Sequence, residues 1–257
     1  MTPELRATIE DAYRIFGGYT VRRSLSVCHC NSCMSDETEH ELLTTPLREI
    51  PYKLLAEYTN SAHDWDDGPV AHQMRYFLPR YLELIAINDS PFSMDIDICL
   101  RRLADAGWRE KWPKAEENII DRFFDDIVRS YVAKLSLVQW PVGWRLEFDL
   151  TDVLTMIATA RGDIDRALAV WDASKDPAAA IQMAAMRERV LMETRRTYLH
   201  SAYLKEDPVT ADKIGAFLMR PEVDDRLVRA FFDIDDPHLQ QLVSDAIYPR
   251  ATAPPPR

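Results

Sequence analysis

Glycine is scarce in this sequence, with only seven among 257 residues, well below the roughly 7% usual in proteins. The 16 prolines, in contrast, mostly stand where a helix can begin, as in "TPEL", "IPYKLL", "WPKAEE" and "RPEVDD". This combination predicts an all-α protein.

Long apolar runs and a basic leader are also missing. The first residues, "MTPELRATIEDAYRIF", are amphipathic and partly acidic, and no run of about 18 apolar residues occurs anywhere. We therefore expect a cytoplasmic protein that does not cross a membrane. The net charge of −11 disfavours nucleic acid and anionic membranes as partners and favours a basic protein partner.

Recognisable catalytic motifs are the third absence. The chain contains no G-x-S-x-G, no P-loop and no G-x-G-x-x-G. The stretch "ETEHELL" begins like H-E-x-x-H, but Thr44 stands where a zinc protease needs its second histidine. The sequence thus favours a non-enzymatic protein without deciding the question.

Helical periodicity and capping residues predict the elements of a first lobe over residues 1–140. Thr2 is an N-cap and Pro3 a first helical position, with Gly17-Gly18 as the end of that helix. Further helices are expected over 70–87, where Pro79 must kink or restart the helix, and over 113–135.

Residues 135–150, "LSLVQWPVGWRLEFDL", lose the helical period and predict an extended connector that can include a short strand pair. A second lobe of mostly antiparallel helices follows over 151–250, and the tail 251–257 is expected to be disordered. Its helices are predicted to start at Thr151, Asp163, Pro177, Arg195, Thr210, Pro221 and Pro237.

Three of the four cysteines fall within six positions, Cys28, Cys30 and Cys33 in "SVCHCNSCMSDE". In a reducing cytosol such a cluster is more typical of thiols or metal ligands than of structural disulfides. Three thiolates at this spacing can grip Zn²⁺ from one turn, and we expect a structural zinc ion. An iron–sulfur cluster, a thiol–disulfide pair of Cys30 and Cys33, and plain reduced cysteines remain alternatives.

A fourth zinc ligand must come from elsewhere in the chain. His63 is the first choice; the other candidates are His29, His40, His72 and Cys99.

Acidic residues concentrate directly after the cysteines. Between Asp36 and Asp67 the chain has nine acids and only two bases, a density that can steer a basic partner toward this face. The residues predicted to contact such a partner are Asp36, Glu37, Glu39, Glu41, Asp64, Trp65, Asp66 and Asp67.

Several blocks together resemble a bacterial family of helical cytoplasmic proteins with a C-x-C-x-x-C segment and no assigned activity. The blocks, spread over about residues 8–190, are "VCHCNSCM", "LLTTPLREIP", "LLAEYTNSAHDWDD", "MRYFLPRYLELIA" and "LADAGWREKWPKAE". The resemblance implies a bacterial cytoplasmic protein in which the cysteine segment belongs to the family pattern. It brings no catalytic residues.

These features lead to three functional hypotheses. The first is a non-enzymatic partner-binding protein, most concretely a bacterial immunity or toxin-neutralising protein. The second is a metal-dependent enzyme or sensor that uses the cysteine loop. The third is a scaffold subunit of a larger assembly, which predicts an exposed apolar patch around "AAAIQMAAMRERVLM".

Overall fold

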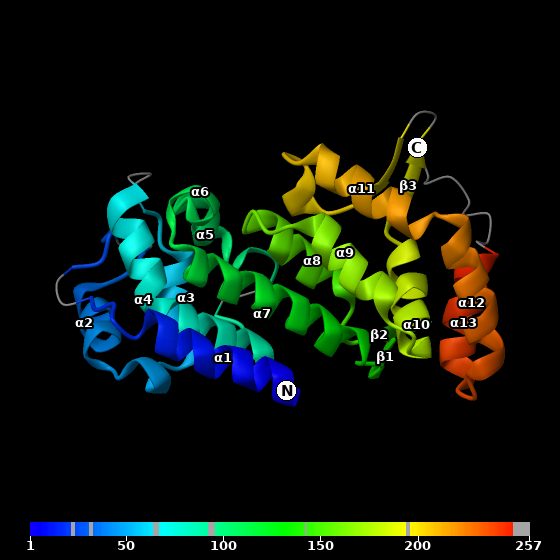
Figure 1. Ribbon diagram of the computed structural model, residues 1–257, viewed down its shortest axis with the longest axis horizontal. Coiled ribbons are helices and arrows are strands. Elements are labelled where there is room, and N and C mark those ends of the chain that lie inside the picture. The colour runs from blue at the N-terminus through cyan, green and yellow to red at the C-terminus, as the bar shows by residue number, and fades with distance from the viewer. Residues whose placement is uncertain are drawn as a thin grey trace. The chain divides into compact units, whose positions relative to one another are not determined.

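The computed structural model describes residues 1–21, 24–30, 33–63, 67–91, 96–141, 143–193 and 196–248. Helices dominate this part of the chain, and the strands in it form two separate antiparallel pairs (Figure 1). The all-α prediction is confirmed. Within the same ranges, no helix is both long and apolar enough to cross a membrane.

The chain divides into two compact units. Unit 1 comprises Met1–Ser130 and Asp152–Ile164, and unit 2 comprises Tyr131–Thr151 and the residues from Asp165 on. The division thus passes through three helices and returns residues 152–164 to the first unit, whereas the sequence placed a single boundary between residues 135 and 150. The predicted tail at 251–257 lies outside the described residues.

Unit 1 contains the cysteine segment and most of the longer helices. Its helices are α1 (Pro3–Phe16), α2 (Asp36–Thr44), α3 (Tyr52–Asn60), α4 (Asp67–Ala86), α5 (Arg101–Asp105), α6 (Trp108–Lys111), most of α7 (Lys114–Val132) and most of α8 (Leu150–Thr159), with 3-10 turns at Leu47–Glu49 and Ile96–Ile98.

Helix α1 forms as the sequence predicts. The Thr2 side chain accepts a hydrogen bond from the Leu5 amide at 3.3 Å, and Pro3 occupies the first turn. Helix α1 lies against α4 (Figure 1). Its buried stripe begins at Leu5, and Thr8 donates to Asp126 of α7 at 2.6 Å. Local capping therefore sets where α1 begins, and its apolar stripe sets what it packs against.

Helix α4 continues through Pro79 without a restart. A proline inside a helix costs about 3 kcal/mol, but Phe77, Leu78, Tyr81 and Leu82 on either side of it are all 0% exposed. Burying each such side chain contributes about 1.5–3 kcal/mol. Tertiary burial therefore outweighs the lost backbone hydrogen bond.

The described part of unit 2 contains five helices and two strand pairs. They are α9 (Ile164–Ala173), α10 (Pro177–Arg187), α11 (Pro208–Leu218), α12 (Pro221–Asp233) and α13 (Pro237–Ile247), with β1 (Leu137–Trp140), β2 (Gly143–Leu146), β3 (Val190–Glu193), β4 (Arg196–Leu199) and a 3-10 turn at Ala202–Leu204. The first residue of α9 belongs to unit 1.

The extended connector is confirmed, because β1 and β2 pair antiparallel between Leu137 and Leu146. The side-chain amide of Gln182 in α10 holds both ends of this connector, because it donates to the backbone oxygens of Tyr131, Lys134 and Phe148 at 2.8–3.1 Å. This amide is fully buried. The Ala- and Met-rich part of this stretch, which lies in α10, is therefore core, because its residues from Ala178 to Ala184 are buried. At the end of the same stretch, Leu191 and Met192 of β3 are 42% and 68% exposed.

The helix predicted to start at Arg195 is wrong, since Arg196–Leu199 form β4, paired with β3. Helix α11 packs on β4 at Gly215, where an added Cβ would lie 2.6 Å from the Tyr198 Cα. The β3–β4 strand pair is thus favoured by a close contact with α11, a helix that comes later in the chain. The sequence "SMDIDICLRRLADAGW" also predicts a helix with Ser93 as its N-cap and Gly107 as its end, and Ser93 falls outside the described residues.

Candidate metal centre

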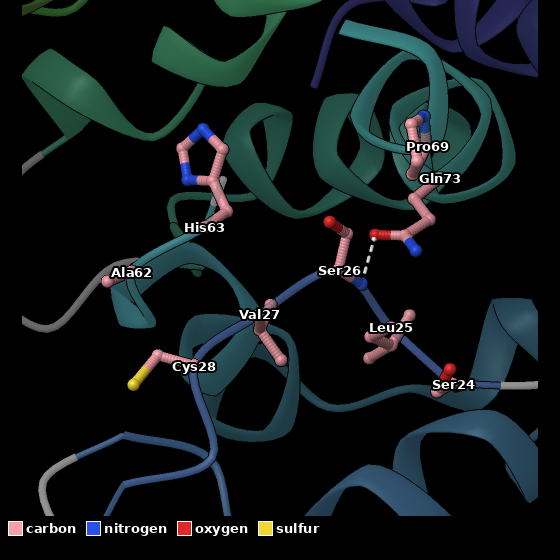
Figure 2. Close-up of a pocket in the computed structure, with 9 residues that line it drawn as sticks. All are labelled: Ser24, Leu25, Ser26, Val27, Cys28, Ala62, His63, Pro69 and Gln73. Carbon is pink, nitrogen blue, oxygen red and sulfur yellow. Dashed lines mark hydrogen bonds between the residues drawn. The ribbon is translucent and has the colours of Figure 1, made fainter. Parts of the chain in front are cut away.

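The segment Ser24–Cys28, which leads into the cysteines, is tied to three helices. The Leu25 amide donates to the Glu39 carboxylate of α2, and the Ser26 amide donates to Gln73 Oε1 of α4 at 3.1 Å (Figure 2). The Cys28 amide donates to the Ala62 oxygen, just past the end of α3, at 2.6 Å. These bonds hold an extended segment in place without regular secondary structure.

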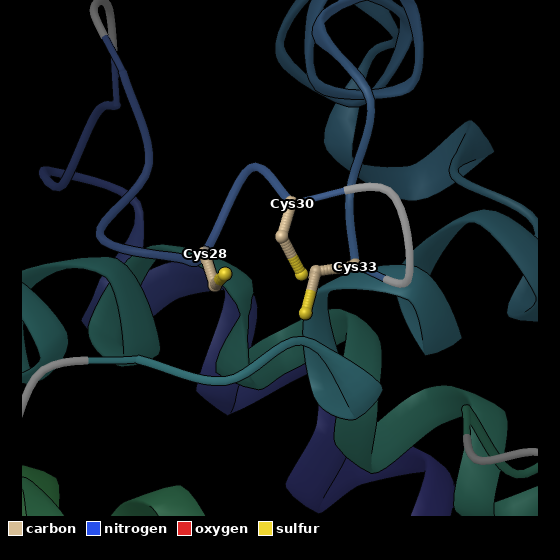
Figure 3. A group of neighbouring side chains, drawn as sticks. All are labelled: Cys28, Cys30 and Cys33. Carbon is tan, nitrogen blue, oxygen red and sulfur yellow. The ribbon is translucent and has the colours of Figure 1, made fainter.

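The three clustered cysteines converge after this segment. Their Sγ atoms lie within 4.8 Å of one another, and none of the three forms a disulfide bond (Figure 3). The Cys33 amide donates to the Cys30 oxygen at 2.9 Å, which links the backbones of these two cysteines. Two thiolates on one tetrahedral zinc ion stand about 3.8 Å apart, so small side-chain movements bring these sulfurs into ligating positions. The cluster can hold a metal ion.

Hydrogen bonding among the thiols affects how readily they ionise. A hydrogen bond from the Cys30 backbone lowers the pKa of the Cys28 thiol, but hydrogen bonds with the Cys30 and Cys33 side chains and partial desolvation raise it, and the net direction is upward. Metal binding must therefore displace protons from the cluster, which makes metal affinity dependent on pH.

The fourth cysteine, Cys99, does not belong to this cluster. Its side chain is buried, and its Sγ lies 3.8 Å from Met156 Sδ of α8. Burial and the nearby Asp97 raise the pKa of its thiol far above the ordinary value. It is a core residue with an unreactive thiol.

His63, the predicted fourth ligand, is engaged elsewhere. Its Nε2 lies 3.2 Å from Asp105 Oδ2, and it is not among the described residues whose ligand atoms meet the three sulfurs within 4.8 Å. In Figure 2 its ring and the Cys28 sulfur extend in different directions. Ligation by His63 needs a change in this arrangement and stays a prediction.

The other histidine candidates also have defined surroundings. His72 Nε2 donates to the Thr20 oxygen at 2.9 Å, and His40 is exposed on α2. His29 meets two acids of α2: its Nδ1 lies 3.2 Å from Asp36 and its Nε2 lies 3.8 Å from Glu39. Sequence reasoning missed this second group, although Asp36 and Glu39 are one helical turn apart and directly follow the cysteine turn.

The four acids of α2 that are predicted to contact a partner differ in their exposure to solvent. Asp36, Glu37 and Glu41 are exposed on α2, and hydrogen bonds from the Glu37 backbone and the Ser35 side chain lower the pKa of Glu37. The Glu39 side chain is only 13% exposed, because it faces Leu25 and His29. The structure therefore leaves three of these four acids available to a partner.

The predicted partner surface also includes four residues near the start of α4. Asp64, Trp65 and Asp66 lie outside the described residues, and Asp67 opens α4 with its side chain likewise outside them.

Ser24–Cys28 also forms one wall of a pocket of about 720 Å³. The opposite walls come from the end of α3 and the start of α4, and the lining residues are Ser24, Leu25, Ser26, Val27, Cys28, Ala62, His63, Pro69 and Gln73 (Figure 2). The Cys28 sulfur extends away from the other lining residues (Figure 2). The pocket and the cysteine cluster are therefore neighbours that share one residue.

Comparison with known proteins adds no assignment to this geometry. No protein-family model, no curated protein and no solved structure matches the chain.

Proposed function

We propose that Cys28, Cys30 and Cys33 bind a structural zinc ion and that the protein is a non-enzymatic, partner-binding protein of the bacterial cytoplasm. Its most concrete form is an immunity or toxin-neutralising protein whose acidic face binds a basic partner. The observation that carries the proposal is the convergence of three cysteine sulfurs beside the exposed acids of α2.

Zinc is the metal that best suits this donor set. Thiolates are soft ligands that favour zinc over magnesium or calcium, and a C-x-C-x-x-C turn supplies three of the four positions of a tetrahedral site. His63 or His29 can complete the site after a side-chain rotation, and water is the remaining choice.

The proposed role of the ion is to hold the segment that precedes α2. This segment has core anchors at its two ends, Leu25 and Met34, while Cys28, His29, Cys30 and Cys33 between them are at least partly exposed. A segment with so little buried apolar surface gains folding free energy from metal ligation.

Metal analysis of protein purified without chelators tests this part. We expect close to one zinc per chain, and lower thermal stability after chelation or in Cys33→Ser. Cys99→Ser is the matched control, because its thiol is remote from the cluster, and it should retain the metal. A zinc content well below one per chain in the wild-type protein would overturn the proposal.

The partner-binding part rests on Asp36, Glu37 and Glu41, three exposed acids on one short helix. Concentrated surface charge accelerates association with a partner of opposite charge, and salt screens the effect. We expect a basic partner captured from the native host in a 1:1 complex, with weaker binding at high salt.

Charge-neutral variants test which face is used. Asp36→Asn combined with Glu37→Gln and Glu41→Gln should slow association by roughly tenfold. Neutralising the exposed Glu222 and Asp225 of α12 is the control and should change little. Equal effects of both sets, or no 1:1 protein complex at all, would contradict the proposed binding face.

A metal-dependent enzyme or sensor is the second candidate, and one observation favours it. Among the described residues, no fourth ligand joins the three thiols within 4.8 Å, and an open coordination position is typical of catalytic zinc. In that case Cys30→Ser should abolish activity with little change in thermal stability, whereas loss of a structural zinc lowers stability as well.

A further inference from the structure

We propose that the pocket between Ser24–Cys28 and α4 binds an uncharged small molecule that carries a carboxamide group. Its volume of about 720 Å³ lies in the usual range for small-molecule sites, which is about 300–1,000 Å³. The proposal does not depend on zinc or on a protein partner.

The orientation of the Gln73 amide is determined by its neighbours. Gln73 Oε1 accepts hydrogen bonds from the Ser26 amide at 3.1 Å and from the Tyr58 hydroxyl at 3.2 Å. A backbone N–H can only donate, so the oxygen and not the nitrogen must face Ser26. The Nε2 end of the amide is therefore left as a donor with a fixed direction.

This donor has no protein acceptor among the described residues, because the hydrogen bonds of Gln73 there all involve Oε1. Gln73 as a whole is only 5% exposed, but its Nε2 is not one of the buried side-chain atoms without a partner, so solvent reaches it. A ligand carbonyl oxygen can take the place of that water.

The other lining groups define the rest of the ligand. The Ser26 hydroxyl lies beside the Gln73 amide (Figure 2) and can accept a hydrogen bond from a ligand N–H. Leu25, Val27 and Pro69 supply apolar surface for an attached ring or chain. A carboxamide offers the C=O and N–H that this pair of polar groups requires.

Charge argues against a carboxylate in the same position. None of the nine described lining residues is Lys or Arg, and the imidazole of His63 lies 3.2 Å from the Asp105 carboxylate. Among these residues, an anion would give up its hydration without gaining an opposite charge.

Benzamide and benzoate form a matched pair of probes, because they differ in the carboxamide and the carboxylate. Benzamide titrated into the ¹⁵N-labelled protein should shift the side-chain NH₂ signals of Gln73 in a saturable way, with a Kd on the order of 1 mM for so small a ligand. Benzoate should bind at least about tenfold more weakly.

Gln73→Glu keeps an acceptor for Ser26 and Tyr58 but removes the donor, so benzamide affinity should fall by at least about tenfold. Gln139→Glu makes the same change at an exposed position of β1 and should leave affinity unchanged. If Gln73→Glu does not fold, the Gln73 signals of the wild-type protein still decide. Their failure to shift at saturating benzamide, or equal binding of benzoate, would overturn the proposal.

Discussion

Removing the Glu39 carboxylate is the most direct way to test how the cysteine segment is held. This side chain lies on α2 but faces inward, where it accepts a hydrogen bond from the Leu25 amide and stands 3.8 Å from His29 Nε2. Leu25 itself is only 5% exposed. In Glu39→Ala, the amide loses its acceptor at a place that water reaches poorly.

The size of the effect follows from this geometry. A hydrogen bond to a charged group contributes about 1.5–3 kcal/mol. If the loss is local, the amide of Leu25 should exchange its hydrogen roughly 10- to 100-fold faster, because each 1.4 kcal/mol is about a factor of ten. The affinity for the proposed zinc ion, measured by chelator competition, should weaken in the same direction, because the segment is less well ordered before the ion binds.

Glu37→Ala is the matched control. It removes a carboxylate from the same turn of α2, but from an exposed position, and we expect a change within about 0.5 kcal/mol. Glu39→Gln keeps an oxygen acceptor without the charge and should fall between the two. Equal hydrogen exchange at Leu25 in Glu39→Ala and Glu37→Ala would refute the reasoning.

Two further predictions concern unit 2. Gly215→Ala should lower the free energy of unfolding by about 1–3 kcal/mol despite better helix propensity, because the new Cβ would lie 2.6 Å from the Tyr198 backbone. Gly18→Ala, with no atom within 4 Å of its Cβ, should be nearly neutral in the same denaturant titration. Burial lowers the pKa of the Lys134 ammonium to about 8, against an opposing effect of Glu147. Below pH 8, Lys134 is charged in both the folded and the unfolded protein, and burial of the charge disfavours folding. Lys134→Met removes this charge and should raise the free energy of unfolding at pH 7 by about 1 kcal/mol, since the group is partly exposed. Above pH 8 the lysine loses its proton first in the folded protein, so the stabilising effect of Lys134→Met should shrink between pH 8 and 10. A constant difference between the melting temperatures of the two proteins over that range would contradict the assigned pKa.

The helices of unit 1 were predictable because their signals are local. Thr2 and Ser35 cap α1 and α2 through their own side chains, and the apolar period of each helix marks its buried face. The strand pair at Arg196 was not predictable in this way. Its stability depends on α11, which follows it in the chain and approaches it closely only because residue 215 is Gly.

The candidate metal centre likewise has one feature that the sequence predicts and one that it does not. The spacing of Cys28, Cys30 and Cys33 was enough to predict that their sulfurs can meet, since a segment of six residues leaves few other arrangements. The surroundings of His63 depend on Asp105, which is 42 residues away. No local sequence pattern predicts the contact between His63 and Asp105.

The sequence by itself determined the all-α class, the positions of most helices and the convergence of the cysteines, because caps, apolar periods and short spacings act within a few residues. Only the tertiary structure decided which acid of α2 faces inward and which end of the Gln73 amide faces Ser26. Ser26 and Gln73 are 47 residues apart in the chain, and the orientation of each group depends on contacts that form only when those segments pack together.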